Sequence, residues 1–176
     1  KEILLFGIYE NSQINFLLKS LNDLRFDYFI DIGANSGLYS LIVGKKFKYI
    51  NVKSFEPIKE SIKKFKKNIV LNEDIKNIEI HNFGLSNKSS RLLMKALKKK
   101  NYIQKGGFGV VNKFDDLTNL HTEYAEFKLG DEILNFVNKQ IMIKIDTEGH
   151  EKNVLEGLKN IFINNKIFLQ IEIFDK

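Results

Sequence analysis

The feature that most constrains the fold of this chain is a regular alternation of short apolar runs with segments of helical periodicity. The runs have the length of strands and end in turn-forming residues, and in the segments between them apolar residues recur every three or four positions. Strands that alternate with helices favour a parallel sheet covered on both faces, so we expect an α/β fold with a mostly parallel sheet. The predicted strands cover residues 27–33, 51–57, 77–86, 140–146 and 166–174.

Helices are predicted before and between these strands. Ser12 is a candidate N-cap of the first helix, and Pro57 stops the second strand at a position that suits the first turn of the next helix. The predicted helices cover residues 12–24, 37–47, the segment that follows Pro57, and 148–164.

Residues 87–139 interrupt the alternation. The stretches "RLLMKAL" and "EYAEFKL" have the pattern of extra strands, whereas the segment between them is polar, contains glycine and has no clean period. We interpret 87–139 as a mobile hairpin and loop inserted near the functional site. An ordinary surface loop is the alternative.

Composition narrows the class of protein. The chain has 176 residues, the size of one domain, and no cysteine, which excludes disulfides and thiolate metal sites. It contains no apolar run of about 18 residues and begins without the long apolar stretch of a signal peptide, so we expect a soluble cytoplasmic protein with no membrane span. The net charge of +6 comes mostly from lysine, and many lysines fall on outer helix faces. Binding of nucleic acid is the alternative explanation of this charge.

The stretch "DIGANSG" follows the first predicted strand and carries the strongest functional signal. In an open parallel sheet, ligands bind outside the carboxyl ends of the strands, which is where Gly33 and Gly37 fall. Glycine allows the backbone to approach a ligand closely, and the helix that starts near Gly37 offers N–H groups to an anionic part of it. Without a ligand, Asp31 would cap this helix and the glycines would form a turn.

Two classes of ligand fit this loop to different degrees. A dinucleotide site has the pattern G-x-G-x-x-G, but here Asn35 and Leu38 stand where the second and third glycines would be. Asp31 would repel a pyrophosphate, whereas it suits S-adenosylmethionine, which carries an ammonium and a sulfonium group. Glu56, at the end of the second strand, is placed to accept both ribose hydroxyls, a role that dinucleotide enzymes share.

Three segments, "DIGANSGLYS", "SFEP" and "IKIDTEGHE", resemble in this order the FkbM-type methyltransferases, a family of class I S-adenosylmethionine-dependent enzymes. The segment "NFGLSN" is similar to the part of that family that follows the third strand. The resemblance extends over about 27–172 and implies a Rossmann-like three-layer sandwich and methyl transfer, most often to oxygen. The loop chemistry and the resemblance together place the cofactor at Asp31, Gly33, Ala34, Asn35, Gly37, Glu56, Pro57, Phe83, Gly84 and Asp146.

From its length, the chain is expected to form a single methyltransferase domain over 1–176. Its parts are an N-terminal helical region (1–26), a cofactor-binding half (27–86), the insertion (87–139) and a final part (140–176). Class I methyltransferases normally finish with a helix and two more strands. Because this chain stops after its fifth main strand, we expect either that these closing strands are absent or that the insertion completes the edge of the sheet.

The stretch "KIDTEGHE" brings candidate catalytic residues to the end of the fourth strand. Attack by an alcohol on a sulfonium methyl is helped by a base, and we expect Asp146 to be that base or to position the acceptor, with Glu148 and His150 as further candidates. A divalent cation held by carboxylates is a second possibility, although we assign no metal ligand. In the absence of catalysis, Asp146 and Glu148 would cap the next helix, Glu151 would form a surface ion pair, and His150 would be a partly buried histidine.

We therefore expect an S-adenosylmethionine-dependent O-methyltransferase that acts on a hydroxyl of a small molecule or glycan. Amino-methyltransferases of nucleobases need a Pro-Pro-aromatic motif at this strand end, but the only proline of the chain is Pro57, which argues against a nucleic-acid substrate. The alternatives are a dinucleotide-dependent oxidoreductase and a catalytically silent cofactor-binding module.

Overall fold

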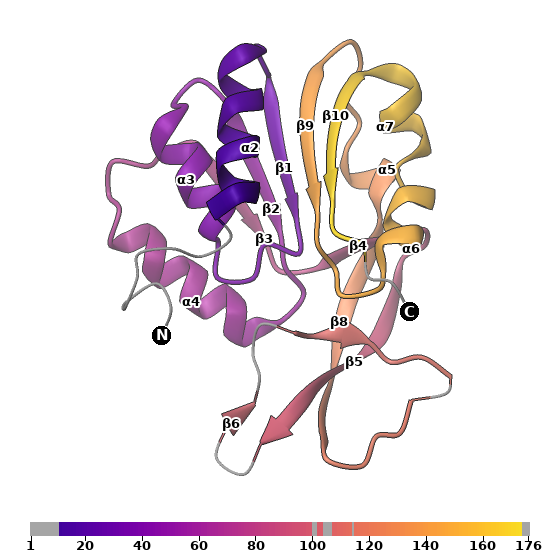
Figure 1. Cartoon of the computed structure of the whole chain (residues 1–176). Coiled ribbons are helices and arrows are strands. Elements are labelled where there is room, and N and C mark those ends of the chain that lie inside the picture. Colours follow the sequence, from indigo (N-terminus) through magenta and orange to yellow (C-terminus); the bar gives the residue numbers. More distant parts are fainter. Residues whose placement is uncertain (1–10, 100–101, 104–106, 114, 174–176) are drawn as a thin grey trace.

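The structure, a computed structural model, describes residues 11–99, 102–103, 107–113 and 115–173. In this part of the chain the central element is a five-stranded sheet with the order β10-β9-β1-β2-β3 (Figure 1). All its strand pairs are parallel, as predicted. The strands are β1 (Tyr28–Ile32), β2 (Asn51–Phe55), β3 (Ile78–His81), β9 (Gln140–Ile145) and β10 (Lys166–Ile171).

Helices cover both faces of this sheet, which gives the three layers expected from the sequence. In Figure 1, α2 (Asn11–Asp23), α3 (Leu38–Lys46) and α4 (Lys59–Val70) lie on one side of the sheet. On the other side lie α5 (Gly130–Ile133), α6 (Glu151–Glu156) and α7 (Lys159–Asn164).

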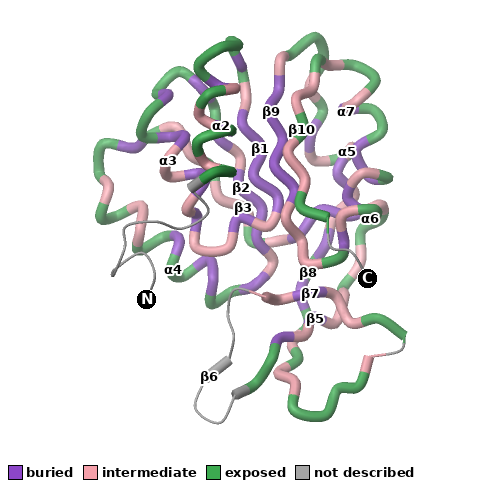
Figure 2. The backbone as a smooth tube through the Cα atoms, in the orientation of Figure 1, coloured by how far each residue is buried: buried purple, intermediate pink, exposed green. Residues whose placement is uncertain are grey.

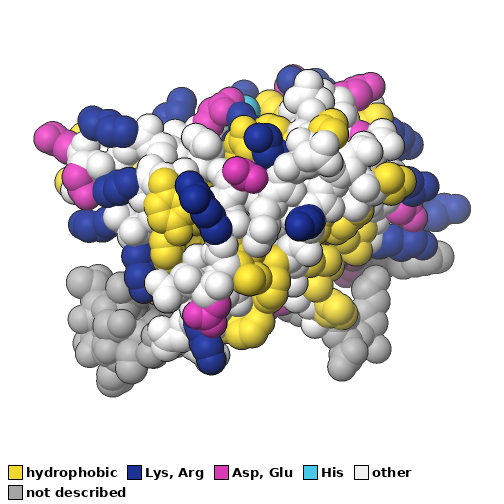
Figure 3. All heavy atoms as spheres, turned by 90° about the horizontal axis from the view of Figure 1, so that it is seen from above, with side chains coloured by type: hydrophobic (Ala, Val, Ile, Leu, Met, Phe, Trp, Pro, Cys, Tyr) yellow, Lys and Arg dark blue, Asp and Glu magenta, His cyan; other side chains and the backbone are white. Residues whose placement is uncertain are grey.

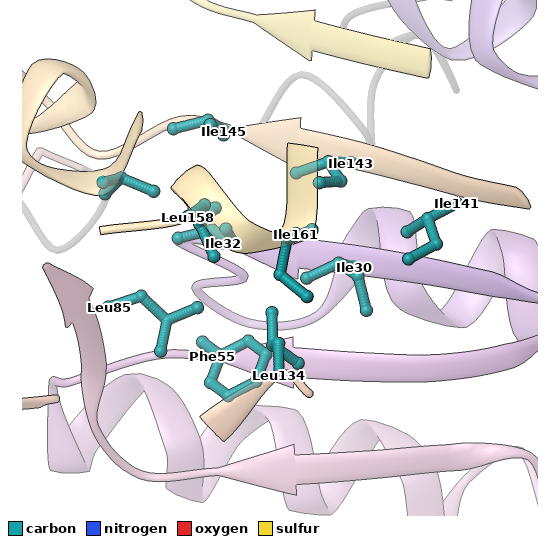
Figure 4. Packing of buried hydrophobic residues seen from close by; sticks show 11 residues of the cluster. Ile30, Ile32, Phe55, Leu85, Leu134, Ile141, Ile143, Ile145, Leu158 and Ile161 are labelled. Atoms are coloured by element: carbon teal, nitrogen blue, oxygen red, sulfur yellow. The ribbon is translucent and has the colours of Figure 1, made fainter. Parts of the chain in front are cut away.

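Alternation along the central strands divides the core between the two faces. Successive side chains of a strand point to opposite faces, so Ile141 and Ile143 pack with α5, α6 and α7, whereas Met142 packs with α2 and α3. Figure 4 shows the first of these clusters, and Figure 2 shows that β1 and β9 are buried along most of their length. This two-sided burial explains why these strands read as continuous apolar runs.

The insertion forms a second sheet with the order β4-β8-β5-β6, to which β7 adds through β5. It lies beyond the carboxyl ends of the parallel strands (Figure 1). Its long strands, β5 and β8, pair antiparallel, so the two extra strands predicted in 87–139 are confirmed. The strands are β4 (Gly84–Ser86), β5 (Ser90–Lys99), β6 (Tyr102–Ile103), β7 (Gly109–Val110) and β8 (Leu120–Leu129).

The predicted third strand, 77–86, is wrong as a single element. It is divided into β3 in the parallel sheet and β4 in the second sheet. At the division, the Asn82 side chain donates hydrogen bonds to the carbonyl oxygens of Glu56 and Pro57, each over 3.1 Å. These bonds tie the turn to the end of β2, so the chain leaves one sheet and enters the other.

The predicted helix 148–164 is also wrong as a single element. Glu148 and Gly149 have positive φ angles of 52° and 98°, so the helix starts only at Glu151. It then ends at Gly157, where a Cβ atom would lie 2.0 Å from the carbonyl oxygen of Ser86. The chain passes close to β4 at this point, and a second helix, α7, begins at Lys159.

Two further expectations about element ends differ from the structure. Pro57 is not in the first turn of α4, because the helix begins at Lys59 with Ile58 as its N-cap. The insertion does not complete the edge of the parallel sheet, because its strands pair with β4. Among the described residues the edges of the parallel sheet are therefore β3 and β10.

On the face seen in Figure 3, the charged side chains are distributed as expected for side chains that face water. Figure 3, which views the molecule along the strands from their amino ends, shows Lys and Arg side chains spread around this face among acidic and apolar side chains. Within the described ranges, every helix is too short or too polar to cross a lipid bilayer.

Candidate active site

A cleft lies where the carboxyl ends of the parallel strands face the second sheet. It encloses about 610 Å³ of empty space, a volume that includes space open to solvent. The parallel sheet and its loops contribute Ile32, Gly33, Asn35, Glu56, Pro57, Ser61, Asp146, Thr147, Glu148 and His150. The second sheet and its loops contribute Gly84, Leu85, Met94, Phe108, Val110 and Phe127, so the insertion lies at the site, as predicted.

The glycine loop after β1 has the backbone geometry that its sequence predicted. Gly33, Asn35 and Gly37 have positive φ angles of 84°, 48° and 85°. The backbone N–H groups of Gly33 and Ala34 donate to the carbonyl oxygen of Phe55 over 2.9 and 3.1 Å. These bonds hold the loop against the end of β2 and turn Asn35 toward Glu56.

Both loop glycines are also required by packing. A Cβ atom on Gly33 would lie 1.8 Å from the carbonyl oxygen of Asp146, and a Cβ atom on Gly37 would lie 2.1 Å from the Phe65 ring. The loop is thus pressed between the end of β9 and helix α4. Gly33 and Gly37 therefore shape the site through protein contacts as well as through the approach of a ligand.

Asp31 lies behind this loop, under α3, and is only 1% exposed. Its Oδ2 atom accepts a hydrogen bond from the Ser40 hydroxyl over 2.6 Å, and Ser40 is 2.7 Å from the hydroxyl of Ser54. Its Oδ1 atom is buried without a hydrogen-bond partner in the described structure. Burial raises the pKa of Asp31, and the Lys144 charge opposes this effect. Asp31 therefore does not line the cleft. It affects the cleft through the electrostatic field of its carboxyl group and through its hydrogen bond with Ser40 of α3.

Glu56 lies in the cleft at the end of β2, as predicted. Its Oε2 atom accepts the backbone N–H of Asn35 over 2.9 Å, and its Oε1 atom accepts that of Ile58 over 2.8 Å. Burial raises the pKa of Glu56 to about 7, although both hydrogen bonds oppose the shift. The carboxyl group is thereby fixed in one orientation, and each oxygen keeps a lone pair for a hydroxyl donor.

The segment after β3 places its two predicted residues differently. Gly84 lines the cleft and is so close to Phe127 that a Cβ atom would lie 2.4 Å from that ring. Phe83 is partly buried in the core beside Phe55, with ring centroids 5.7 Å apart, and the Lys128 ammonium lies 4.3 Å from the centre of its ring. Phe83 thus supports the wall of the cleft from behind.

Asp146 follows β9 directly and lines the cleft. Its Oδ2 atom accepts a hydrogen bond from the Lys144 ammonium over 2.9 Å, and its backbone N–H donates to Ile32. Lys144 is 5% exposed and also lies 4.4 Å from the centre of the Tyr39 ring. Asp146 is therefore not a helix cap; it is a carboxylate held beside a buried cation.

Glu151 is the residue that organises the loop after β9. Its Oε1 atom accepts hydrogen bonds from the backbone N–H groups of Thr147 and Gly149 and from the Thr147 hydroxyl, over 2.9–3.0 Å. The alternative given for Glu151, a surface ion pair, is thus not what the structure shows, because its Oε1 atom holds the loop. The network keeps Glu148 in the cleft with its positive φ angle, and burial followed by the Asp146 and Glu151 charges raises the pKa of Glu148.

His150 lies at the back of the cleft and is 6% exposed. Its Nε2 atom is 2.9 Å from the hydroxyl of Ser86, and its ring meets that of Phe127 edge-on at 5.3 Å. Burial lowers the pKa of His150, so the neutral imidazole is favoured. A neutral imidazole can accept or donate one proton, although the same contacts fit a histidine that only supports the wall.

The charge of the site fits a cationic ligand that carries a ribose. Asp31, Glu56, Asp146 and Glu148 surround the glycine loop, and burial raises the pKa of three of them, Asp31, Glu56 and Glu148. A nearby positive charge would stabilise these carboxylates, whereas a pyrophosphate would repel them. The cradle therefore fits S-adenosylmethionine better than a dinucleotide. In the described ranges no group of three or more His, Cys, Asp and Glu residues is arranged to hold a metal ion.

Several residues of the site escaped the sequence analysis. Lys144 had a signal, since it is a lysine inside an otherwise apolar buried strand. Ser40 and Ser54, which surround Asp31, had only a weak one, because serine is common in helices and strands. Met94 and Phe127 come from the insertion. Which of its residues face the cleft depends on the pairing of β5 with β8, two strands that are distant in sequence.

Comparison with known proteins shows a relation over most of the chain. Residues 31–175 match a family model described as the methyltransferase FkbM domain. The methyltransferase sdnD of Sordaria araneosa is 27% identical over 158 residues, which cover 74% of this chain and 60% of that protein. The crystal structure of a methyltransferase FkbM from Methylobacillus flagellatus KT superposes with a TM-score of 0.56 and 21% identity, covering 84% of this chain and 34% of the other. The chain thus spans 60% and about a third of the lengths of these two relatives, and the structural likeness confirms the predicted class I fold.

Proposed function

The chain belongs to the methyltransferase FkbM domain family, and we propose that it transfers a methyl group from S-adenosylmethionine to a hydroxyl oxygen of a small molecule or glycan. The observation that carries this proposal is the acidic cleft, in which the fixed Glu56 carboxyl group and the neighbouring carboxyl groups surround a glycine loop with positive φ angles. Such a cleft complements a ligand with a ribose at one end and a positive charge at the other.

Different residues of the chain hold the ribose, the positive charge and the adenosine side of this cofactor. Glu56 accepts the ribose hydroxyls, and the carboxylates of Asp146 and Glu148 favour the positive charge. Pro57 and Gly84 form apolar walls on the adenosine side, with Ala34 and Asn35 in the loop between. When bound, S-adenosylmethionine supplies a methyl group on a positively charged sulfur.

The catalytic role proposed for Asp146 is that of the base that receives the acceptor's proton. Its carboxylate is anchored by Lys144, so it is held in one position at the end of β9. A positioned base contributes about 10²–10⁴-fold to the rate of such a transfer, and the rest comes from in-line placement of the reactants. Glu148 and the neutral His150 lie in the same cleft as alternative bases.

Calorimetric titration of the protein with S-adenosylhomocysteine and with NAD tests the proposed cofactor. We expect S-adenosylhomocysteine to bind at one site per chain and NAD to produce no heat of binding, because the carboxylates repel its pyrophosphate. Binding of NAD alone would support the oxidoreductase alternative. A protein that binds S-adenosylhomocysteine but transfers no methyl group to any hydroxylated acceptor would be the silent module.

A further inference from the structure

Asp146 lines a second cavity as well as the cleft. This cavity lies on the α2 side of β9 and β10 and encloses about 730 Å³, including space open to solvent. Its walls come from the start of α2, with Gln13 and Phe16, from Tyr39 of α3, and from the strand ends with Lys144 and Glu172. Asp146 therefore stands between two spaces, one that fits the cofactor and one to which the proposed function assigns nothing.

Asp146 and Glu172 form a pair of carboxyl groups in the wall of this second cavity. Both side chains line this cavity, and the backbone N–H of Glu172 donates to the carbonyl oxygen of Ile145 over 3.0 Å, so the two residues follow the ends of the paired strands β9 and β10. Two ionised carboxyl groups at neighbouring positions repel each other, which favours a proton on the pair. Lys144 pairs with the Oδ2 atom of Asp146, so this cation lies on the Asp146 side of the pair.

The environment of Glu172 agrees with this arrangement. Glu172 is exposed as a residue, but partial desolvation of its carboxyl group, followed by the Asp146 charge, raises the pKa of Glu172 to about 7, and Lys144 opposes the shift. Other charges that act on it come from Glu148. The Glu172 carboxyl group can therefore bind or release a proton near neutral pH.

We propose that the second cavity holds the methyl acceptor and that Glu172 is a further catalytic residue, which together with Asp146 receives the proton of the acceptor hydroxyl. This inference rests on the proposed function, because it requires the cofactor's sulfur to lie on the cleft side of Asp146. When both Asp146 and Glu172 are ionised, the proton of the acceptor hydroxyl goes to this pair of carboxyl groups. The oxygen forms a bond to the methyl carbon while the bond from that carbon to sulfur breaks, and its electron pair stays on the sulfur.

The lining of the second cavity indicates the class of acceptor. Gln13, Lys144 and the carboxyl pair offer donors and acceptors along its walls, and Phe16, which is 54% exposed, offers a flat apolar surface. A flat apolar surface beside several hydrogen-bonding groups suits a ring with several hydroxyl groups. We therefore assign to this cavity a neutral, sugar-like acceptor.

The location is tested by narrowing the second cavity with Gln13→Trp, at an exposed position of α2. Lys19→Trp, on the same helix but outside the cavity lining, is the matched control. Three probes are titrated by calorimetry: S-adenosylhomocysteine, 5′-methylthioadenosine, which lacks the amino-acid end, and an analogue with nitrogen in place of sulfur that carries a hydroxypropyl arm. We expect Gln13→Trp to weaken only the armed analogue, by about tenfold or more, and Lys19→Trp to weaken none.

Any other result of these titrations overturns the acceptor assignment or the proposed function. If Gln13→Trp weakens S-adenosylhomocysteine but not 5′-methylthioadenosine, the cavity holds the amino-acid end of the cofactor and the acceptor assignment is overturned. Unchanged binding of the armed analogue also overturns it. If the wild-type protein binds none of the probes, the proposed function itself fails, and this inference fails with it.

The role of Glu172 is tested by carboxyl NMR of protein labelled with ¹³C at glutamate side chains, with Glu172→Gln to assign its signal. We expect the Glu172 carboxyl to titrate near neutral pH in the wild-type protein and to return toward the ordinary glutamate value of about 4.3 in Asp146→Asn. Glu73→Gln, at an exposed position outside the site, is the control and should leave the Glu172 signal unchanged. Titration of Glu172 in the ordinary range in the wild-type protein would rule out a proton acceptor at Glu172 near neutral pH and overturn its catalytic role.

Discussion

At the scale of single residues, Glu56 links the backbone of the site to its ligand chemistry. Its two oxygens fix Asn35 and Ile58, which belong to different loops, and the same carboxyl group faces the cleft. A carboxyl group with this degree of burial is expensive to ionise unless donors surround it. The ribose hydroxyls would supply the missing donors, so binding and ionisation of Glu56 should support each other.

The first prediction concerns Glu56→Ala. Loss of the charge-assisted hydrogen bonds to the ribose should cost about 2–3 kcal/mol, or roughly a hundredfold in the affinity for S-adenosylhomocysteine. Calorimetric titration measures this affinity, and circular dichroism shows whether the domain remains folded. Glu73→Ala, at an exposed position, is the control. An affinity equal to that of the wild-type protein would show that Glu56 does not hold the ribose.

The second prediction concerns Asp146→Asn. The variant keeps the shape of the side chain but loses the charge that pairs with Lys144 and receives the proton. We expect turnover to fall by about 10²–10⁴-fold while the affinity for S-adenosylhomocysteine changes little. Single-turnover rates with labelled S-adenosylmethionine and a hydroxylated acceptor measure the effect. If turnover is retained and only cofactor affinity falls, Asp146 is a binding residue and not the base.

At the scale of elements, the turn between β1 and α3 is held by contacts that a side chain would break. From the sequence we expect the glycines of this turn to allow the close approach of a ligand. The structure adds two protein contacts, the carbonyl oxygen of Asp146 at Gly33 and the Phe65 ring at Gly37. A substitution here therefore disturbs the packing of β1 against β9 and of α4 against the turn.

The third prediction compares Gly33→Ala with Gly149→Ala. Both glycines have positive φ angles, 84° and 98°, so both alanines meet a backbone cost of about 1 kcal/mol or more. Only Gly33 would also clash, because nothing lies within 4 Å of a Cβ atom on Gly149. We expect Gly33→Ala to reduce the free energy of unfolding by about 2 kcal/mol more than Gly149→Ala, as measured by urea denaturation. Equal losses would mean that the turn can move away from Asp146.

A helix or strand could be predicted when the residues that determine it lie within the element itself. The strands of the parallel sheet could be predicted from apolar runs such as 140–146, because a strand buried on both faces is apolar along its own length. The division of 77–86 and of 148–164 could not be predicted in this way. It depends on Asn82 reaching the end of β2 and on Gly157 touching Ser86, which are contacts between distant parts of the chain.

The same distinction applies to the candidate site. Gly33, Glu56 and Asp146 were predicted at the cleft because they sit at strand ends, and the carboxyl ends of parallel strands share one edge. Asp31 was predicted to face the ligand, but alternation along β1 turns its side chain under α3. Glu172 gave no signal, because Asp146, the other carboxyl group of the second cavity, follows the neighbouring strand β9, which is distant in sequence.

At the scale of the whole molecule, two sheets share one cleft, and the cleft carries buried carboxyl groups that oppose folding when ionised. Ionisation of Glu56 is the clearest case, with its pKa raised from 4.5 to about 7. The folded state therefore binds this proton more tightly than the unfolded chain, and the associated stability is lost as the pH rises from 4.5 through 7. His81 and His150 act in the opposite direction below 6.5, because burial lowers the pKa of each.

The fourth prediction isolates this effect with Glu56→Gln. We expect the free energy of unfolding of the wild-type protein to fall by about 2–3 kcal/mol relative to the variant between pH 5 and pH 8, without ligand. Comparison with the variant cancels the histidine contributions, and urea denaturation at each pH provides the measurement. Parallel pH profiles of the two proteins would show that Glu56 titrates in its ordinary range in the folded state.

The central claim is that the acidic cleft between the two sheets holds S-adenosylmethionine with its ribose on Glu56 and its sulfur beside Asp146. A crystal structure of the complex with S-adenosylhomocysteine tests this claim most directly. The account predicts both ribose hydroxyls within hydrogen-bond distance of the Glu56 carboxyl group, the sulfur next to Gly33 and Asp146, and the cavity beside Glu172 still open to an acceptor. A ligand bound away from Glu56, or one whose amino-acid end fills the cavity beside Glu172, would contradict it.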